Sequence, residues 1–87
     1  MQADKKQVTR LLKTARGQIE GIIKMIEEDR YCMDVSNQLL ATQAILQRAN
    51  KEVIGAHMKH CVHDAVESDN ADKKIEEMIT FINQLLK

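Results

Sequence analysis

The chain has no proline and no tryptophan among its 87 residues, and it has only three glycines. Its aromatic residues are a single tyrosine, Tyr31, and a single phenylalanine, Phe81. Without proline nothing forces a helix to break, and a sheet-based fold would need more aromatic and β-branched side chains. The residues that dominate instead favour helices, namely leucine, isoleucine, methionine, alanine, lysine, glutamate and glutamine. The composition therefore predicts an all-α fold.

Long apolar runs and a secretory signal are also missing. No segment approaches the ~20 apolar residues needed to span a bilayer, and no charged stretch followed by an apolar core precedes the domain. We therefore expect a cytoplasmic protein without a membrane partner. In that compartment the two cysteines, Cys32 and Cys61, favour metal binding or redox sensing over a structural disulfide.

Signatures of catalysis are lacking too. The sequence shows no carboxylate pair, no glycine-rich phosphate loop and no nucleophile accompanied by a base and an orienting group. We therefore expect neither an enzyme nor a small-molecule substrate.

The formal net charge is zero, but the charges are unevenly distributed. Residues 1–24 contain six basic and two acidic side chains, whereas residues 64–87 contain three basic and six acidic ones. A basic end of this kind is a modest indication of a polyanionic partner.

Apolar residues recur at intervals of three and four along most of the chain, which predicts three amphipathic helices. The first begins at Asp4, a candidate N-cap, and ends at the charged stretch 27–30. The second runs from about residue 33 to about residue 67. The third follows the turn-and-cap cluster Ser68–Asp69–Asn70 and continues to the end of the chain.

The second helix is too long for a small monomer. At 1.5 Å per residue it would measure about 50 Å, and it carries two apolar faces. We expect one domain, residues 1–87, folded as a three-helix protomer with a long second helix. Its unused apolar faces predict an antiparallel homodimer that assembles further into a dimer-of-dimers tetramer.

Two thiols and an imidazole form the most distinctive pattern in the sequence. His57 and Cys61 are four residues apart, so on a helix they lie one above the other. Cys32 falls within about 20° of the same face, but it lies roughly 37 Å away along a continuous helix. An antiparallel second copy would place Cys32 of one chain opposite His57 and Cys61 of the other.

Such a donor set suits a soft, closed-shell ion that tolerates three ligands, and copper(I) fits best. Zinc would want a fourth ligand, and nickel or cobalt would want more nitrogen and oxygen. A Cys/His pair at this spacing also occurs among ordinary packed or surface residues. The spacing by itself leaves both interpretations open.

Four segments form a specific pattern together with the spacing C-x24-H-x3-C, namely Arg16–Ile22, Tyr31–Val35, Gln47–Asn50 and His57–Cys61. This pattern resembles the CsoR family of metal-sensing repressors. The resemblance implies a three-helix protomer, a dimer of dimers, and copper(I) bound by Cys32, His57 and Cys61. It also implies supporting roles for Tyr31 and for Glu77, because a carboxylate can orient the second nitrogen of a bound imidazole.

Other branches of that family leave a distinct signature. Its nickel/cobalt and formaldehyde sensors have a histidine or a carboxylate where this chain has Cys61. Its persulfide sensors keep both cysteines but lack the histidine, so His57 argues against that branch. Two thiols can nevertheless react with sulfane sulfur, and a sulfur-sensing role for Cys32 and Cys61 stays open.

DNA recognition has weaker support in the sequence, which contains no helix-turn-helix, zinc-finger or RNP motif. Four basic side chains on the first helix project within about 60° opposite its apolar face, namely Lys6, Arg10, Lys13 and Lys24. The resemblance implies DNA contacts at Lys13, Arg16 and Arg48. It departs at Leu11, where the family commonly has arginine and this chain has Arg10 one residue earlier.

The sequence therefore predicts a copper(I)-responsive repressor that binds operator double-stranded DNA in its metal-free form and releases it on copper(I) binding. Two alternatives stay open. One is a repressor that senses persulfides or other reactive sulfur, and the other is a metal chaperone or storage bundle without a DNA role.

Overall fold

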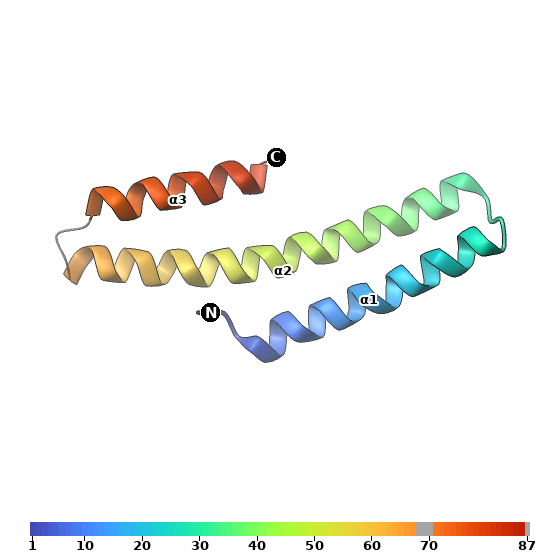
Figure 1. Cartoon of the computed structure of the whole chain (residues 1–87), viewed down its shortest axis with the longest axis horizontal. Coiled ribbons are helices and arrows are strands. Elements are labelled where there is room, and N and C mark those ends of the chain that lie inside the picture. Colours follow the sequence, from blue (N-terminus) through green and yellow to red (C-terminus); the bar gives the residue numbers. More distant parts are fainter. Residues whose placement is uncertain (68–70, 87) are drawn as a thin grey trace. The chain divides into compact units, whose positions relative to one another are not determined.

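The computed structural model describes residues 1–67 and 71–86, and these residues form three helices in chain order (Figure 1). Helix α1 spans Lys5–Glu27, α2 spans Cys32–Glu67 and α3 spans Ala71–Leu86. The described residues contain no strand, so the predicted all-α protomer with a long second helix is confirmed. The cluster Ser68–Asp69–Asn70, predicted as a turn and cap, lies outside the described residues.

Helix α1 begins and ends through local hydrogen bonds. The Asp4 carboxylate accepts from the backbone N–H of Lys6 at 2.9 Å and of Gln7 at 3.4 Å, which confirms Asp4 as the N-cap. At the other end Asp29 adopts a positive φ of 56°, a conformation that aspartate tolerates better than most residues. The chain then turns directly into α2.

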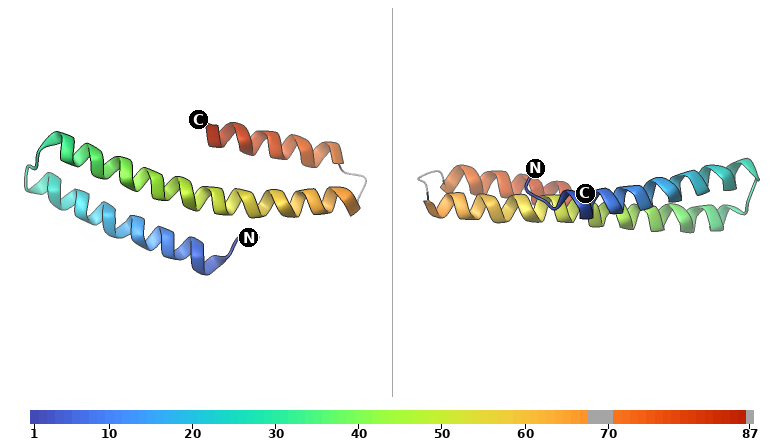
Figure 2. Two further views of the ribbon diagram at one scale, coloured as in Figure 1. Left: turned by 180° about the vertical axis from the view of Figure 1, so that it is seen from behind. Right: turned by 90° about the horizontal axis from the view of Figure 1, so that it is seen from below.

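Residues Asp4–Asn50 form one compact unit, made of α1 and the first part of α2 (Figure 2). The only buried polar side chain in the described part of the chain belongs to Thr42. Its hydroxyl lies 2.9 Å from Gln18 Oε1 and 3.0 Å from the Gln38 carbonyl, and its single proton serves one acceptor at a time. This contact links α1 to α2. The apolar core of this unit comprises Val8, Leu11, Ala15, Ile22 and Ala49.

The second unit combines Met1–Ala3 with Lys51–Lys87, and its described helices are the second part of α2 and α3. Its buried side chains are few: Ala3, Ile54 and Cys61. Cys61 is the most deeply buried of these, with 1% of its surface exposed. A thiol is therefore part of the small core on which α3 packs.

Both units leave large apolar side chains exposed. In the first unit they include Leu12, Ile19, Ile23, Leu39, Leu40 and Leu46, and in the second Val62, Val66, Ile75, Ile79 and Ile82. Such faces are normally covered by other chains or ligands. Within the described residues, no helix is both long and apolar enough to cross a bilayer.

Candidate metal centre

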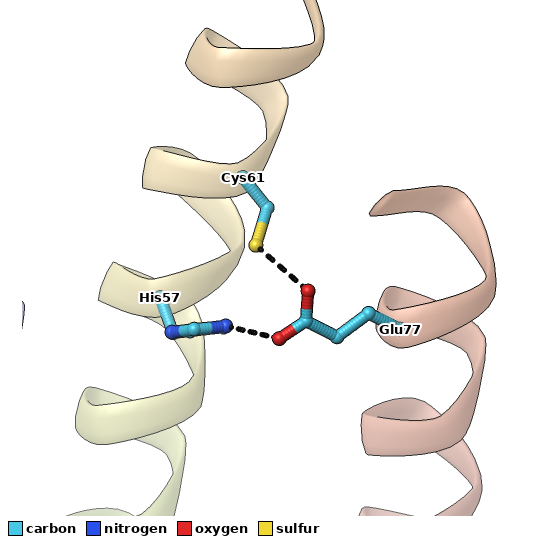
Figure 3. Close-up of side chains that lie close together, drawn as sticks. All are labelled: His57, Cys61 and Glu77. Atoms are coloured by element: carbon cyan, nitrogen blue, oxygen red, sulfur yellow. Dashed lines mark hydrogen bonds and ion pairs between the residues drawn. The ribbon is translucent and has the colours of Figure 1, made fainter. Parts of the chain in front are cut away.

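The second unit brings an imidazole, a thiol and a carboxylate together (Figure 3). His57 and Cys61 project from successive turns of α2, and Glu77 reaches them from α3. The three residues can each offer one ligand atom, and these atoms lie within 4.8 Å of one another. Among the described residues no other group of three or more histidine, cysteine or acidic side chains meets this criterion.

Glu77 contacts both of its neighbours, one with each carboxylate oxygen. His57 Nε2 lies 2.8 Å from Oε1, and the Cys61 thiol donates to Oε2 at 3.7 Å. A carboxylate accepts hydrogen bonds, so the contact favours the imidazole tautomer with its proton on Nε2. The other ring nitrogen, Nδ1, then carries the free lone pair.

The surroundings shift the ionisation of the thiol and the carboxyl group in opposite directions. Burial raises the pKa of the Cys61 thiol, the negative charge of Glu77 raises it further, and nearby Lys74 opposes the shift. The hydrogen bond from His57 lowers the pKa of Glu77, so the carboxyl group stays ionised. The cluster thus holds a protonated thiol beside a carboxylate, and a metal would have to displace the thiol proton.

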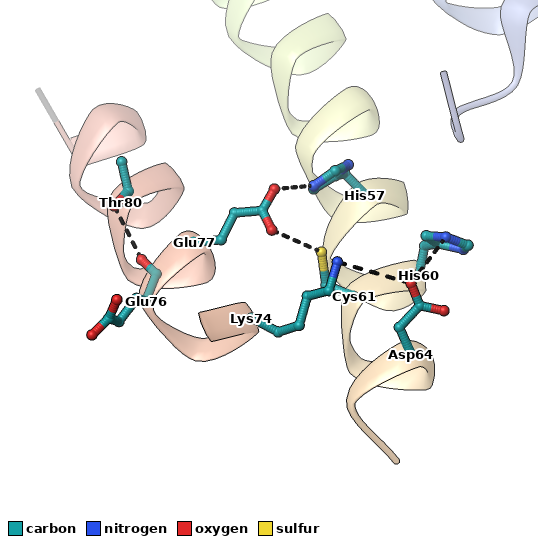
Figure 4. A network of polar contacts seen from close by, with 8 residues as sticks. All are labelled: His57, His60, Cys61, Asp64, Lys74, Glu76, Glu77 and Thr80. Atoms are coloured by element: carbon teal, nitrogen blue, oxygen red, sulfur yellow. Dashed lines mark hydrogen bonds and ion pairs between the residues drawn. The ribbon is translucent and has the colours of Figure 1, made fainter. Parts of the chain in front are cut away.

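Polar contacts extend this cluster along α2 (Figure 4). Lys74 Nζ lies 3.9 Å from Asp64 Oδ2, and His60 Nε2 lies 3.5 Å from the same oxygen. Lys74 therefore connects the start of α3 with the turn of α2 that follows Cys61. Both contacts are partly exposed, so each contributes little to stability.

Cys32 and Tyr31 belong to the first unit, whereas the cluster belongs to the second. Cys32 is exposed at the first residue of α2, and an open cavity of about 300 Å³ lies beside it. Tyr31 precedes the helix and is also exposed, and its carbonyl accepts from the N–H groups of Asp34 and Val35. The assignment of Cys32 as a third ligand and of Tyr31 as a supporting residue stays a prediction.

The basic residues predicted to contact DNA all belong to the first unit. An open groove of about 630 Å³ along the start of α1 includes Arg10 and Lys13 in its lining. Arg16 and Arg48 are exposed but do not line this groove. Lys6 of the predicted stripe also lines the groove, together with three residues that the stripe did not include: Lys5, Thr9 and Thr14.

Two residues beside the metal centre escaped sequence reasoning: Lys74, and Phe81, whose ring centroid lies 5.1 Å from that of His57. Lys74 and Phe81 lie three residues before and four residues after Glu77, so both belong to the face of α3 that carries Glu77. That spacing was the one available signal for either residue. Their roles depend on how α3 packs on α2.

The fold and this thiol–imidazole–carboxylate cluster define a small helical protein equipped to bind a metal ion. Residues 4–84 match the family described as the metal-sensitive transcriptional repressor. The chain belongs to this family, and the resemblance seen in the sequence is confirmed.

The chain is also similar to several proteins described as copper-sensing transcriptional repressors. The copper-sensing transcriptional repressor CsoR of Bacillus subtilis (strain 168) is 36% identical over 84 residues, which cover 97% of this chain and 83% of the relative. That of Mycobacterium ulcerans (strain Agy99) is 46% identical over 68 residues, which cover 78% of this chain but 58% of the relative. That of Mycobacterium bovis (strain BCG / Pasteur 1173P2) is 40% identical over 77 residues, which cover 88% of this chain and 65% of the relative.

Two solved structures have the same fold. The copper-sensing repressor CsoR with Cu(I) from Geobacillus thermodenitrificans NG80-2 gives a TM-score of 0.83 at 32% identity, covering 94% of this chain and 85% of that one. The nickel-responsive transcriptional regulator InrS gives a TM-score of 0.87 at 24% identity, covering 98% and 96%. At that identity the second match supports the fold alone.

Proposed function

We propose that this protein is a copper(I)-responsive transcriptional repressor, which binds operator DNA without metal and releases it when copper(I) binds. The observation that carries the proposal is the cluster of His57, Cys61 and Glu77, because it pairs a soft thiol with an imidazole whose second nitrogen is already oriented. Relatives described as copper-sensing repressors support the same metal. The protein would act as a DNA-binding regulator in the cytoplasm and not as an enzyme.

Three residues would hold the ion: His57 and Cys61 of one chain and Cys32 of a second copy. The 25-residue spacing between Cys32 and His57 on a helix is too long for one chain to close the site. Copper(I), when bound, supplies a soft centre that ties two thiolates and an imidazole together. Glu77 fixes the imidazole through Nε2, and Tyr31, next to Cys32, would reach the same site from the second copy.

The site therefore requires an antiparallel homodimer, and we propose that two dimers form a tetramer. The exposed apolar side chains of both units support this assembly, because a monomer would leave them in water. Twofold symmetry then generates two equivalent sites per dimer.

Operator DNA would bind to the basic surface of the first unit, through Arg10, Lys13, Arg16 and Arg48. Arg10 and Lys13 share the groove at the start of α1 with two further lysines, so positive charge is concentrated there. A tetramer would repeat this surface four times. Binding by phosphate contacts of this kind weakens steeply with salt, because counterions are released from the DNA.

Copper(I) and DNA must then lower each other's binding affinity by the same factor. If copper(I) lowers the affinity for DNA, DNA lowers the affinity for copper(I) equally, since the two binding steps share one thermodynamic cycle. We infer that copper(I) biases a bistable arrangement of the helices toward one with lower affinity for DNA. The metal cluster and the basic residues belong to different units, and both units include part of α2.

The decisive experiment titrates the reduced protein with copper(I) under anaerobic conditions while it is bound to a labelled duplex from upstream of its own gene. We expect one copper(I) per protomer and release of the duplex over the same range, and we expect Cys61→Ser protein to show neither. Release by a sulfane-sulfur donor but not by copper(I) would identify a sulfur sensor instead. Tight copper(I) binding without salt-dependent DNA binding would identify a storage or chaperone protein.

A further inference from the structure

Helix α3 contacts the His57 imidazole at two places. Glu77 bonds its Nε2 at 2.8 Å, and the ring of Phe81 packs against it with a centroid separation of 5.1 Å and an interplanar angle of 82°. Glu77 and Phe81 are four residues apart, so they project from one face of α3. Both contacts lie within the second unit, and the imidazole is held from one side by a carboxylate and by an aromatic ring.

The two contacts restrain different motions of the imidazole. The torsion that turns a histidine ring about its Cβ–Cγ bond has broad minima, so the ring plane is not set by the side chain itself. Nε2 lies closer to that rotation axis than Nδ1 does, so a turn of the ring displaces Nε2 less and the hydrogen bond to Glu77 does not by itself fix the plane. Nδ1 lies further from the axis and swings most when the ring turns. A perpendicular aromatic ring opposes this turn directly.

There is free space around the His57 and Phe81 rings, so rotation of the imidazole is not blocked by close packing. An open cavity of about 380 Å³ is lined by His57 and Phe81 together with Met1, Gln2, Val53 and Ile54. His57 is also 37% exposed, so close packing does not lock its ring. Without the aromatic ring the imidazole would have room to change its plane.

We propose that Phe81 is a positioning residue for the metal response: its edge-to-face contact sets the plane of the His57 imidazole and so aims the nitrogen that Glu77 leaves free. The metal part of this inference rests on the proposed function. Phe81 itself donates nothing to the ion, and an apolar side chain of similar size without a ring cannot replace it. A tyrosine can, because it keeps the ring.

The test compares Phe81→Leu, Phe81→Tyr and the wild-type protein, with Ile82→Leu as the control for an apolar change at the neighbouring position on α3. In the metal-free proteins, nitrogen and carbon NMR of the imidazole reports tautomer and ring motion. We expect wild type, Phe81→Tyr and Ile82→Leu to show one Nε2–H tautomer with a fixed ring whose signals are shifted by the aromatic neighbour. Phe81→Leu should show an averaged ring at unchanged helicity.

For copper(I), we expect Phe81→Leu to bind about 2- to 12-fold more weakly, the range that an aromatic pair contributes to an equilibrium constant. Phe81→Tyr should keep wild-type affinity.

An imidazole ring that already averages between orientations in the wild-type protein would overturn the inference, and that measurement needs no variant. A Phe81→Leu protein with a fixed imidazole and wild-type copper(I) affinity would also overturn the inference. The proposed function would still hold in that case, provided that the wild-type protein binds copper(I) and then releases DNA. A wild-type protein that neither binds copper(I) nor releases DNA in its presence would instead refute the proposed function. The NMR comparison would still decide whether Phe81 sets the plane of the His57 ring.

Discussion

Replacing Glu77 by glutamine should weaken copper(I) binding about 10- to 100-fold, the usual cost of losing a partner that orients a metal-bound histidine. Glutamine keeps the size of the side chain but removes the charge that favours a proton on His57 Nε2 across the 2.8 Å contact. Folding should change little, because the His57 and Glu77 side chains are 37% and 38% exposed and water screens their attraction. The substitution therefore separates metal affinity from stability.

An opposing effect must be weighed. The negative charge of Glu77 raises the pKa of the Cys61 thiol, so its removal would ease the loss of the thiol proton and favour copper(I). Burial is the larger cause of the raised pKa, and Glu77→Gln leaves Cys61 buried. We therefore expect the loss of imidazole orientation to dominate, and the net change to be weaker binding.

The assay is competition against a copper(I) chelator of known affinity, with DNA release followed by fluorescence anisotropy on the same samples and stability by chemical denaturation. Glu76→Gln is the matched control, since it removes the same charge one residue away and its carboxylate points away from the cluster (Figure 4). Wild-type affinity and DNA release in Glu77→Gln would refute the role of the carboxylate. An equal loss in Glu76→Gln would show that overall charge, and not this contact, is responsible.

Three further predictions follow from the proposed assembly, thiol environments and DNA surface. Mixing Cys32→Ala with Cys61→Ala protein should restore one copper(I) site per heterodimer, and verified heterodimers without a site would mean that the ligands come from one chain. In the metal-free protein Cys32 should be alkylated well before Cys61, whose thiol is buried with a raised pKa, and mass spectrometry of timed reactions would expose the reverse order. Replacing Lys13, Arg16 or Arg48 by alanine should weaken DNA binding and flatten its salt dependence with copper(I) affinity unchanged. Loss of the tetramer in these variants would show that the residues are structural instead.

Local structure could be predicted from the sequence because its causes are local. The N-cap at Asp4 needs only a carboxylate followed by free N–H groups, and the bounds of the helices follow the apolar period and its interruptions. The pairing of His57 with Cys61 follows from helical geometry alone. These features required no knowledge of which helix packs on which.

The environment of the two thiols could not be predicted in this way. Cys32 and Cys61 are the same residue type on the same helix, yet one is exposed and the other has 1% of its surface exposed. The raised pKa of Cys61 follows from that burial and from a carboxylate 16 residues further along the chain. Neither cause can be read from the spacing of the cysteines.

The sequence by itself determined that this chain is helical, where its helices begin and end, and that an imidazole and a thiol share one face of the long helix. The family resemblance implied a role for Glu77, but only the tertiary structure decided how this carboxylate and Phe81 complete that face. The packing of α3 on α2 brings Glu77 to 2.8 Å from His57 and sets the ring of Phe81 across it. A change of one residue in the register of α3 would turn both side chains by about 100°. Contacts between helices depend on such registers, which arise from side-chain packing and not from local periodicity.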